Sequence, residues 1–371
     1  MLHEFWQNFA HNLFKPLLLF FYLGFLITVL KVRFEFPYVI YQGLTIYLLL
    51  AIGWRGGEAL AHIDPRDIGN IAGFVILGFV WNFANGAIAY FLLNQLTAIR
   101  RVDKATVASY YASDGAGSFA ACMGLLTVMG VAFDAYMPVM LAIMEIPGCL
   151  LALYLVGRLR RSGMDATGLM PDEAGYTAPA RTGPGAAAQP VFDRSQKGSR
   201  VLSRELLGEV FLNPGLGLLI GGIVIGFISG LQGVQVVRDD DAFFVSAFHG
   251  ALCLFLLEMG ITAARKLRDL RSAGRGFIVF GLLAPNLFAM LGISVAHGYA
   301  LVTHTDLKPG TYVLFAILCA AASYIAVPAV QRLAIPEASP TLPLAASLGL
   351  TFSYNVTIGI PVYIEIARLF S

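Results

Sequence analysis

The stretch Ser113-Asp114-Gly115-Ala116-Gly117-Ser118 interrupts an otherwise apolar run from Ala105 to Gly130. An acid, two glycines and two serines disfavour a continuous helix at the depth where a membrane helix is normally most apolar. Non-helical backbone at that depth is stable only where protein or a wet cavity satisfies its polar groups. In secondary transporters such breaks mark the substrate and ion site, which is the hypothesis for this stretch. The alternative is a glycine kink whose acid faces a neighbouring helix.

The composition indicates an integral membrane protein. Hydrophobic residues make up 57% of the 371 residues and charged residues only 13%, whereas a soluble domain carries about 25% charged residues. Ten apolar segments approach the ~20 residues that a helix needs to cross the hydrocarbon core. These segments are Pro16–Leu30, Pro37–Gly53, Ile68–Leu96, Ala105–Met129, Tyr136–Val156, Phe211–Leu231, Ala242–Ala264, Gly276–Val302, Thr311–Val330 and Leu342–Phe370.

The basic residues of the loops set the orientation. If the N-terminus lies outside, most loop lysines and arginines fall on the cytoplasmic side, including the cluster Arg158–Arg161 and the cluster Arg265–Arg271. The positive-inside rule then predicts a multi-pass protein of the bacterial inner membrane with both termini outside, in the periplasm.

Residues 158–209 form one long polar interruption rich in Gly, Pro, Ala and Ser. Such a composition buries too little apolar area to order itself, so we expect a flexible cytoplasmic linker there. It separates a first five-helix repeat, residues 1–157, from a second, residues 210–371. Two halves with an odd number of spans must have opposite orientations, which is the arrangement of inverted-repeat transporters.

Short matches between the two halves support this arrangement because they occur in the same order. They pair Gly56–Leu60 with Gly260–Ala264, Ala112-Ser113 and Ala116 with Ala322-Ser323 and Ala326, and Ile146-Pro147 with Ile360-Pro361.

The ninth span contains a second break, at Ser323–Pro328. Pro328 lacks the amide proton of a continuous helix and suits the first turn of a new one. The fourth and ninth spans are therefore both predicted to be broken, and their second half-helices start near the midplane from opposite sides. Each such start carries about +0.5 of an elementary charge and free N–H groups, so the pair is expected to bind a small anion. The predicted substrate-binding residues are Gly115, Gly117, Ser118, Ser323, Tyr324, Ile325 and Ala326.

Asp114 would repel such an anion unless a cation lies between them. A sodium ion held by a carboxylate, hydroxyls and freed carbonyls is the most economical choice. A proton on Asp114 is the alternative coupling ion, because burial disfavours the charged form of a carboxyl group.

Several motifs together resemble the sodium-dependent bicarbonate transporter family, from about Tyr22 to Phe370 and excluding the linker. The motifs are Ile52–Gly57, the break at Ala112–Ser118, Met144-Glu145-Ile146-Pro147, Leu257–Gly260, Ser323–Pro328 with Arg332 and Ile335-Pro336, and Ile360-Pro361. The resemblance implies a homotrimer of ten-span subunits, a gate domain, a core domain that holds the broken helices, and an elevator-like movement. In some members the cytoplasmic face binds a small regulator related to the signalling protein PII.

The chain departs from that family where the chemistry lies. Cyanobacterial members have Ser-Ser-Asp-Ile-Ser-Gly-Pro in the second break, whereas here Tyr324 replaces the acid and Ala326 replaces a serine. In the first break they have Ala-Val-Ser-Gly-Ser-Thr, which here reads Ser113 to Ser118. We therefore hypothesise that the carboxylate is kept but moved to the pseudo-symmetric position, Asp114. Bicarbonate itself is then an inference at the level of the family.

Two further polar residues are candidates for the ion site. Glu145 lies where family members carry an acid in a Met-Asp-Ile-Pro run, and it belongs either to the ion network or to a hydrogen bond with a neighbouring helix. Asn355 either faces the crossing of the two breaks or bonds across helices. The predicted cation-binding residues are thus Ser113, Asp114, Glu145 and Asn355. No cofactor and no metal other than sodium is expected, since the cysteines and histidines are scattered singly.

We therefore predict an all-α membrane protein that acts as a sodium-coupled symporter, importing bicarbonate or a similar small anion. The alternative is an ion- or proton-coupled symporter of another small carboxylate or a zwitterion. An enzyme is disfavoured because no Ser/His/Asp set, no His-Glu-x-x-His helix and no phosphate loop occurs. The predicted partners are the anion, Na⁺, membrane lipid, two further copies of the chain and a PII-like regulator, and no nucleic acid.

Overall fold

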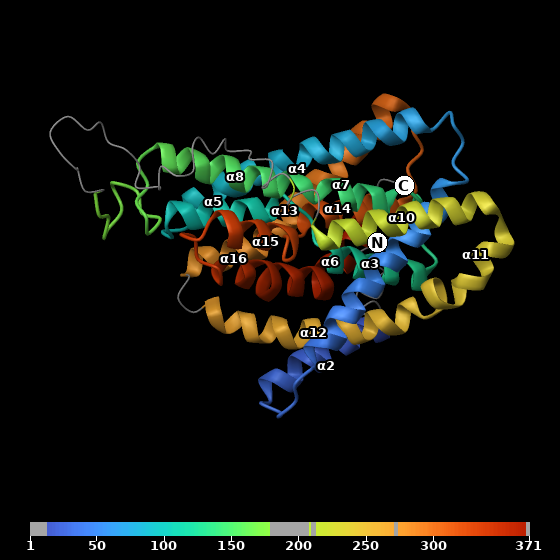
Figure 1. Ribbon diagram of the computed structural model, residues 1–371, viewed down its shortest axis with the longest axis horizontal. Helices are drawn as coiled ribbons and strands as arrows, with labels where there is room; N and C mark the ends of the chain where they lie inside the picture. Colours follow the sequence, from blue (N-terminus) through green and yellow to red (C-terminus); the bar gives the residue numbers. More distant parts are fainter. Residues whose placement is uncertain (1–12, 179–207, 209–212, 271–273, 369–371) are drawn as a thin grey trace.

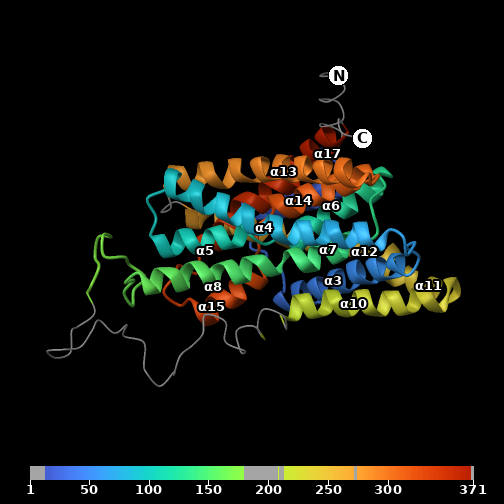
Figure 2. The ribbon, with the colours of Figure 1, turned by 90° about the horizontal axis from the view of Figure 1, so that it is seen from above.

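The computed structural model describes residues 13–178, 208, 213–270 and 274–368, and every regular element within these residues is a helix. Most of the helices run side by side along the longest axis of the molecule, and α2 and α3 cross it obliquely (Figures 1 and 2). Their bounds are α2 Pro16–Val29, α3 Tyr38–Leu60, α4 Ile68–Leu96, α5 Arg101–Tyr111, α6 Ala116–Met129, α7 Met137–Met144, α8 Ile146–Arg161, α10 Pro214–Gln232, α11 Val234–Asp241, η1 Ala242–Ser246, α12 Phe248–Asp269, α13 Arg275–Thr303, α14 Pro309–Ala320, α15 Ala326–Ala334, α16 Leu342–Leu344, η3 Ala345–Phe352, η4 Asn355–Gly359 and α17 Ile360–Ala367.

Each of the ten predicted apolar segments coincides with one of these helices or with a consecutive run of them. Within the described part of the chain, five helical segments are long and apolar enough to cross a membrane: Ile68–Leu96, Met137–Arg161, Pro214–Gln232, Ala242–Asp269 and Arg275–Thr303. Large apolar side chains such as Ile76, Val80 and Leu283 are exposed on them. Apolar side chains that face outward on long helices are stable against lipid, so the chain is a multi-pass membrane protein.

Two pairs of helices make the most extensive contacts, α3 with α10 and α2 with α12. Glycine permits both approaches. A Cβ atom on Gly57 would lie 2.0 Å from the carbonyl oxygen of Ile223 in α10, and one on Gly260 would lie 2.1 Å from that of Phe21 in α2. Small residues let membrane helices pack backbone against backbone, which gains van der Waals contact where no hydrophobic effect drives association.

The predicted breaks are present in both spans, with slightly different bounds. Backbone is non-helical over 112–115, between α5 and α6, and over 321–325, between α14 and α15. Pro328 is the third residue of α15, a position whose N–H has no partner within the helix. Figure 2 shows α5, α6 and α14 between α13 on one side and α3, α8 and α10 on the other, with α15 at the edge beside α8. Residues 112–115 and 321–324 of the two breaks are buried. The breaks are therefore enclosed by protein, as their free backbone groups require.

The predicted linker begins with ordered structure in its described part. Helix α8 continues to Arg161, and Asp165 then accepts hydrogen bonds from the backbone N–H groups of Thr167, Leu169 and Thr177 at 2.9, 2.9 and 3.0 Å. Arg100 at the start of α5 donates to the carbonyl oxygen of Thr167 at 2.7 Å. Residues 179–207 and 209, which make up most of the rest of the linker, lie outside the described residues, as do residues 210–212 of the second repeat.

Candidate functional site

The two breaks lie directly against each other. The N–H of Ser323 donates to the carbonyl oxygen of Tyr110 at 2.8 Å, and the N–H of Gly117 donates to the hydroxyl oxygen of Tyr324 at 2.8 Å. A Cβ atom on Gly115 would lie 3.3 Å from the Cβ of Ala321. Segments that are more than 200 residues apart in the sequence thus form one crossing, which brings the starts of α6 and α15 together.

The predicted substrate-binding residues lie at these two helix starts. Gly115 is the N-cap residue of α6, with Gly117 and the buried Ser118 in its first turn. Ile325 precedes α15 and Ala326 begins it. The hydroxyl of Ser323 accepts a hydrogen bond from the N–H of Val327, with 3.4 Å between the two atoms. Free N–H groups and the positive end of the helix dipole at such starts attract an anion.

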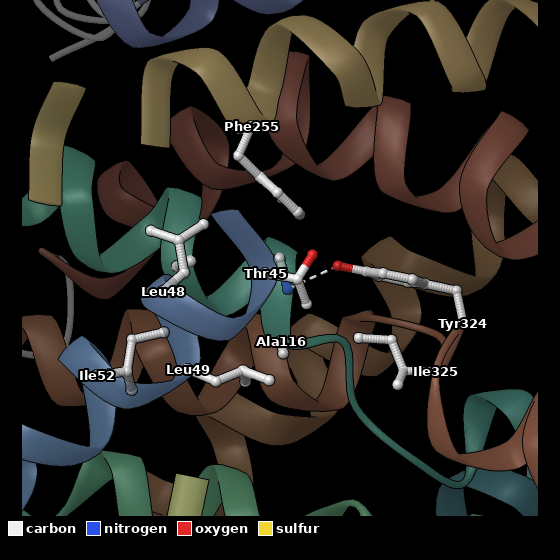
Figure 3. A pocket seen from close by; sticks show the side chains of 10 residues that line it. Thr45, Leu48, Leu49, Ile52, Ala116, Phe255, Tyr324 and Ile325 are labelled. Carbon is white, nitrogen blue, oxygen red and sulfur yellow. Dashed lines mark hydrogen bonds between the residues drawn. The ribbon is translucent and has the colours of Figure 1, made fainter. Parts of the chain in front are cut away.

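A hollow opens beside the start of α6 (Figure 3). Its lining residues are Thr45, Leu48, Leu49 and Ile52 of α3, Ala116, Gly117 and Ala120 of α6, Phe255 of α12, and Tyr324 and Ile325 of the second break. Its empty volume, including its open mouth, is about 260 Å³, of which about 10 Å³ can be occupied by a water-sized solute. Figure 3 shows the ring of Tyr324 extending across the hollow, so that its hydroxyl covers the N–H of Gly117. Most of the lining is hydrocarbon, and the polar groups are concentrated at the helix start.

Asp114 is buried in the first break, with 2% of its surface exposed. Neither of its carboxylate oxygens has a hydrogen-bond partner among the described residues. The preceding residue, Ser113, donates from its hydroxyl to the carbonyl oxygen of Glu145 at 3.0 Å. The structure thus brings Ser113, Asp114 and Glu145 together, at the junction of α7 and α8.

Glu145 also lines a second hollow, together with Ile146, Cys149, Asn213, Leu216 and Ala326, which leaves no room for a water-sized solute. Its carboxyl group is close enough to that of Asp114 for the two to repel each other when ionised. Among the described residues no ion pair to Lys, Arg or His neutralises either acid. Because the two acids repel each other, ionisation of one disfavours ionisation of the other.

Asn355 lies at the second break, and both its amide nitrogen and its amide oxygen have a hydrogen-bond partner. Its amide nitrogen donates to the carbonyl oxygen of Ala320 at 3.0 Å, and its amide oxygen accepts from the hydroxyl of Tyr363 at 3.0 Å. These bonds fix the last turn of α14. The cation-binding role predicted for Asn355 stays a prediction, and in this geometry its oxygen is already engaged.

Two buried residues that the sequence reasoning did not select lie on α4, which packs against the first break at Gly86 and Ala112. Asn82 and Asn85 of α4 are fully buried, and their amide nitrogens donate to the carbonyl oxygens of Met144 at 2.7 Å and Cys319 at 3.2 Å. Both amide oxygens lack a partner among the described residues. The available signal was their spacing, because residues i and i+3 share one face of a helix.

The described residues contain no group of three or more His, Cys, Asp or Glu side chains that could hold a metal ion.

Comparison with known proteins gives one result that covers nearly the whole chain. The Na⁺-dependent bicarbonate transporter superfamily matches residues 16–368. No curated protein matches the chain significantly. The family is one of transporters and not of enzymes, and its match extends over both breaks, the hollow and the buried acids. The chain therefore belongs to the Na⁺-dependent bicarbonate transporter superfamily.

Proposed function

We propose that the protein is a sodium-coupled secondary active transporter that imports bicarbonate or a similar small anion. The observation that carries this proposal is the unpaired carboxylate of Asp114 beside two converging helix starts. The family match supports both the sodium ion and the anion as solutes. In this proposal the helix starts attract the anion and the carboxylate of Asp114 attracts the sodium ion. Both groups lie at one crossing, so the two solutes are transported together.

The anion is held by the N–H groups at the starts of α6 and α15. Gly117 is the centre of the α6 end, and its N–H is covered by the hydroxyl of Tyr324 at 2.8 Å. An arriving anion either displaces this hydroxyl or accepts a hydrogen bond from it, since a phenol can donate as well as accept. Tyr324 therefore controls access to the anion site.

The cation is held next to Asp114. An ionised carboxylate without a partner is costly to bury, so a bound cation stabilises it directly. The cation also screens Asp114 from the anion. Each solute thus improves the binding of the other, and such coupling is reciprocal at equilibrium.

The arrangement of the helices is compatible with an elevator-like movement. Helices α2, α3, α10 and α12 pack as two pairs and correspond to a gate domain. The hollow lies between this group, which contributes Thr45, Leu48 and Phe255, and the broken helices of a core domain. A solute held there moves with the core when the core slides past the gate. Ten spans in two inverted five-helix repeats, a homotrimer, periplasmic termini, an inner-membrane location and a cytoplasmic PII-like regulator complete the proposal.

The apolar lining of the hollow favours a second candidate substrate. Leu48, Leu49, Ile52 and Phe255 offer hydrocarbon surface that bicarbonate cannot use. A small carboxylate with a short apolar chain would place its charge at the helix start and its chain against this surface. Each buried CH₂ group adds about 0.8 kcal/mol to binding.

Uptake by proteoliposomes tests both candidates. Vesicles containing the protein should accumulate labelled bicarbonate when a sodium gradient points inward and not when choline replaces sodium. Unlabelled acetate, propionate and butyrate are added as competitors. Competition that strengthens with chain length would identify the second candidate, whereas accumulation of bicarbonate without sodium would contradict the coupling.

A further inference from the structure

We propose that Asn82 and Asn85 of α4 complete, with Asp114, a binding site for one sodium ion. This inference rests on the proposed sodium coupling and adds ligands from a helix outside both breaks. Three buried side chains supply the observation. Both carboxylate oxygens of Asp114 and the amide oxygens of Asn82 and Asn85 lack a hydrogen-bond partner among the described residues.

Four contacts put Asp114 and the two asparagines in the same region of the fold. Asn82 is bonded to the carbonyl of Met144, and Ser113 to the carbonyl of the next residue, Glu145. On the other side, Asn85 is bonded to the carbonyl of Cys319, close to Ala321, against which Gly115 packs. The neighbours of Asp114 on both sides thus contact residues that lie one or two positions along the chain from those that the two amides bond.

Helix α4 itself crosses the first break at this level. A Cβ atom on Gly86, the residue after Asn85, would lie 2.5 Å from the Cβ of Ala112. Asn82 and Asn85 are three positions apart and therefore occupy one face of α4. That face is turned towards the segment 112–115, which contains the carboxylate.

The bonds that the amides already make orient their oxygens. Each asparagine donates through its nitrogen to a backbone carbonyl, at 2.7 Å for Asn82 and 3.2 Å for Asn85. A planar amide held in this way has a fixed oxygen on the opposite corner. A buried amide oxygen without a partner is costly, and a cation would satisfy both oxygens and the carboxylate at once.

The chemistry of this ligand set fits a monovalent hard cation. All four atoms are oxygens, which hard cations such as Na⁺ prefer. One carboxylate and two neutral amides carry a single negative charge, which balances one positive charge. Glu145 lies farther along, facing the second hollow with Ala326 and Leu216, and is not needed for the balance.

Asn355 provides an internal contrast. Its nitrogen donates to Ala320, the neighbour of Cys319, but its oxygen accepts from Tyr363. The amide oxygen of Asn355 in η4 therefore has a hydrogen-bond partner, whereas the amide oxygens of Asn82 and Asn85 in α4 have none among the described residues.

The test measures sodium binding by the purified full-length protein. Chloride is the only anion present, so no bicarbonate or other candidate substrate contributes. The readouts are the binding of radioactive ²²Na⁺ and the rise of the melting temperature as NaCl replaces choline chloride. A ligand that binds only the folded state raises the melting temperature with its concentration. Asn82→Leu and Asn85→Leu should each raise the dissociation constant for Na⁺ by about tenfold, a loss of about 1.4 kcal/mol, and flatten the rise in melting temperature.

The matched control is Asn286→Leu. Asn286 lies on α13, and its amide oxygen accepts from the hydroxyl of Tyr354, so its loss should leave sodium binding unchanged. Sodium binding that is equally strong in both α4 variants overturns the proposal. If neither leucine variant folds, Asn85→Asp decides, because a second carboxylate at the site should make Ca²⁺ raise the melting temperature where it does not in the parent. Absence of that Ca²⁺ response also overturns it.

These outcomes separate the site from the transport function. Sodium binding that depends on Asn82 and Asn85, in a protein that takes up no bicarbonate, upholds the site and contradicts the proposed substrate. Sodium-driven bicarbonate uptake that is insensitive to both residues upholds the function and removes the site.

Discussion

Helix α5 has a buried acid at each end, and the two acids have opposite surroundings. In its first turn Asp103 accepts hydrogen bonds from the guanidinium of Arg100 at 2.7 and 3.0 Å and from the N–H of Ser339 at 2.8 Å. Beyond its last turn Asp114 is at least as buried and accepts none from the described residues. The first acid is neutralised within the fold, whereas the second has no partner among the described residues and is the proposed cation ligand. The two acids are alike in burial and differ in their partners.

The largest effect is expected from Asp114→Asn. The amide keeps the shape of the side chain but removes the charge that holds the cation, so sodium-driven uptake should fall to the level of empty vesicles. The protein should remain folded and assembled, because no hydrogen bond to the carboxylate is lost. Uptake by proteoliposomes and size-exclusion chromatography measure the two properties.

Asp134→Asn is the matched control for Asp114→Asn. Asp134 lies in the loop before α7 and already accepts a hydrogen bond from the hydroxyl of Thr311 at 2.7 Å. Uptake in this variant should persist. If Asp114→Asn transports as the parent does, Asp114 is not the coupling acid and the contrast between the two ends of α5 has no functional meaning.

The next largest effect is a loss of stability, and it is expected from a change to Asp103 in the first turn of α5. Asp103→Asn removes the ion pair with Arg100 and weakens the bond to Ser339, and the loss of such a buried charged bond typically costs about 1–3 kcal/mol of unfolding free energy. The melting temperature of the detergent-solubilised protein should fall, while uptake per folded molecule stays at the parent value. A variant that is stable but has lost its response to sodium would contradict the division of roles.

Much of the fold follows from the sequence, because apolar segments of helical length and breaks rich in glycine and serine have local causes. The break at Ser113–Ser118 and the position of Pro328 near the start of a helix are of this kind. An acid in an apolar run also identifies Asp114 without a structure. All of these signals depend on residues close together in the chain.

The remaining parts of the site depend on contacts between distant segments. Asn82 and Asn85 look in sequence like ordinary amides that bond across helices, and only their unpaired oxygens distinguish them. The sequence cannot show that Tyr324 bonds to Gly117, since the two are brought together by the crossing. The sequence makes Asn355 a candidate cation ligand, but it cannot show that the hydroxyl of Tyr363 already donates a hydrogen bond to the amide oxygen of Asn355.

A smaller effect is expected from Tyr324→Phe, which tests whether the second break also leaves a group available to solutes. The hydroxyl of Tyr324 occupies the N–H of Gly117, so its removal frees a donor for the anion. We expect the KM for the anion to decrease several-fold and the stability to decrease slightly, because the N–H is unpaired when no anion is bound. Kinetics of uptake over a range of anion concentrations measure this. Tyr354→Phe, which loses a bond only to Asn286, is the control, and an increased KM in Tyr324→Phe would show that the phenol is itself a ligand.

The smallest effect is expected at Asp165, an acid with hydrogen-bond partners like Asp103. It lies in the loop after α8, which Arg100 joins to the start of α5. Burial raises the pKa of Asp165, but hydrogen bonds from the N–H groups of Thr177 and Leu169 and from the hydroxyl and N–H of Thr167 outweigh it and hold the pKa at about 2. The ordinary value is about 3.9.

Because the pKa in the folded loop is the lower one, the ionised form of Asp165 stabilises the loop. This stabilisation is complete above about pH 4 and is lost as the pH falls towards about 2. A spin label on Ala166→Cys should therefore become mobile over that interval in the parent and be mobile at neutral pH in Asp165→Asn. Asp172→Asn, whose carboxylate bonds only to Arg101 among the described residues, should keep the parent profile. A label that stays immobile at pH 2 would show that the loop is held by Arg100 and Thr167 alone, so that the pairing of this acid, unlike that of Asp103, contributes nothing to the fold.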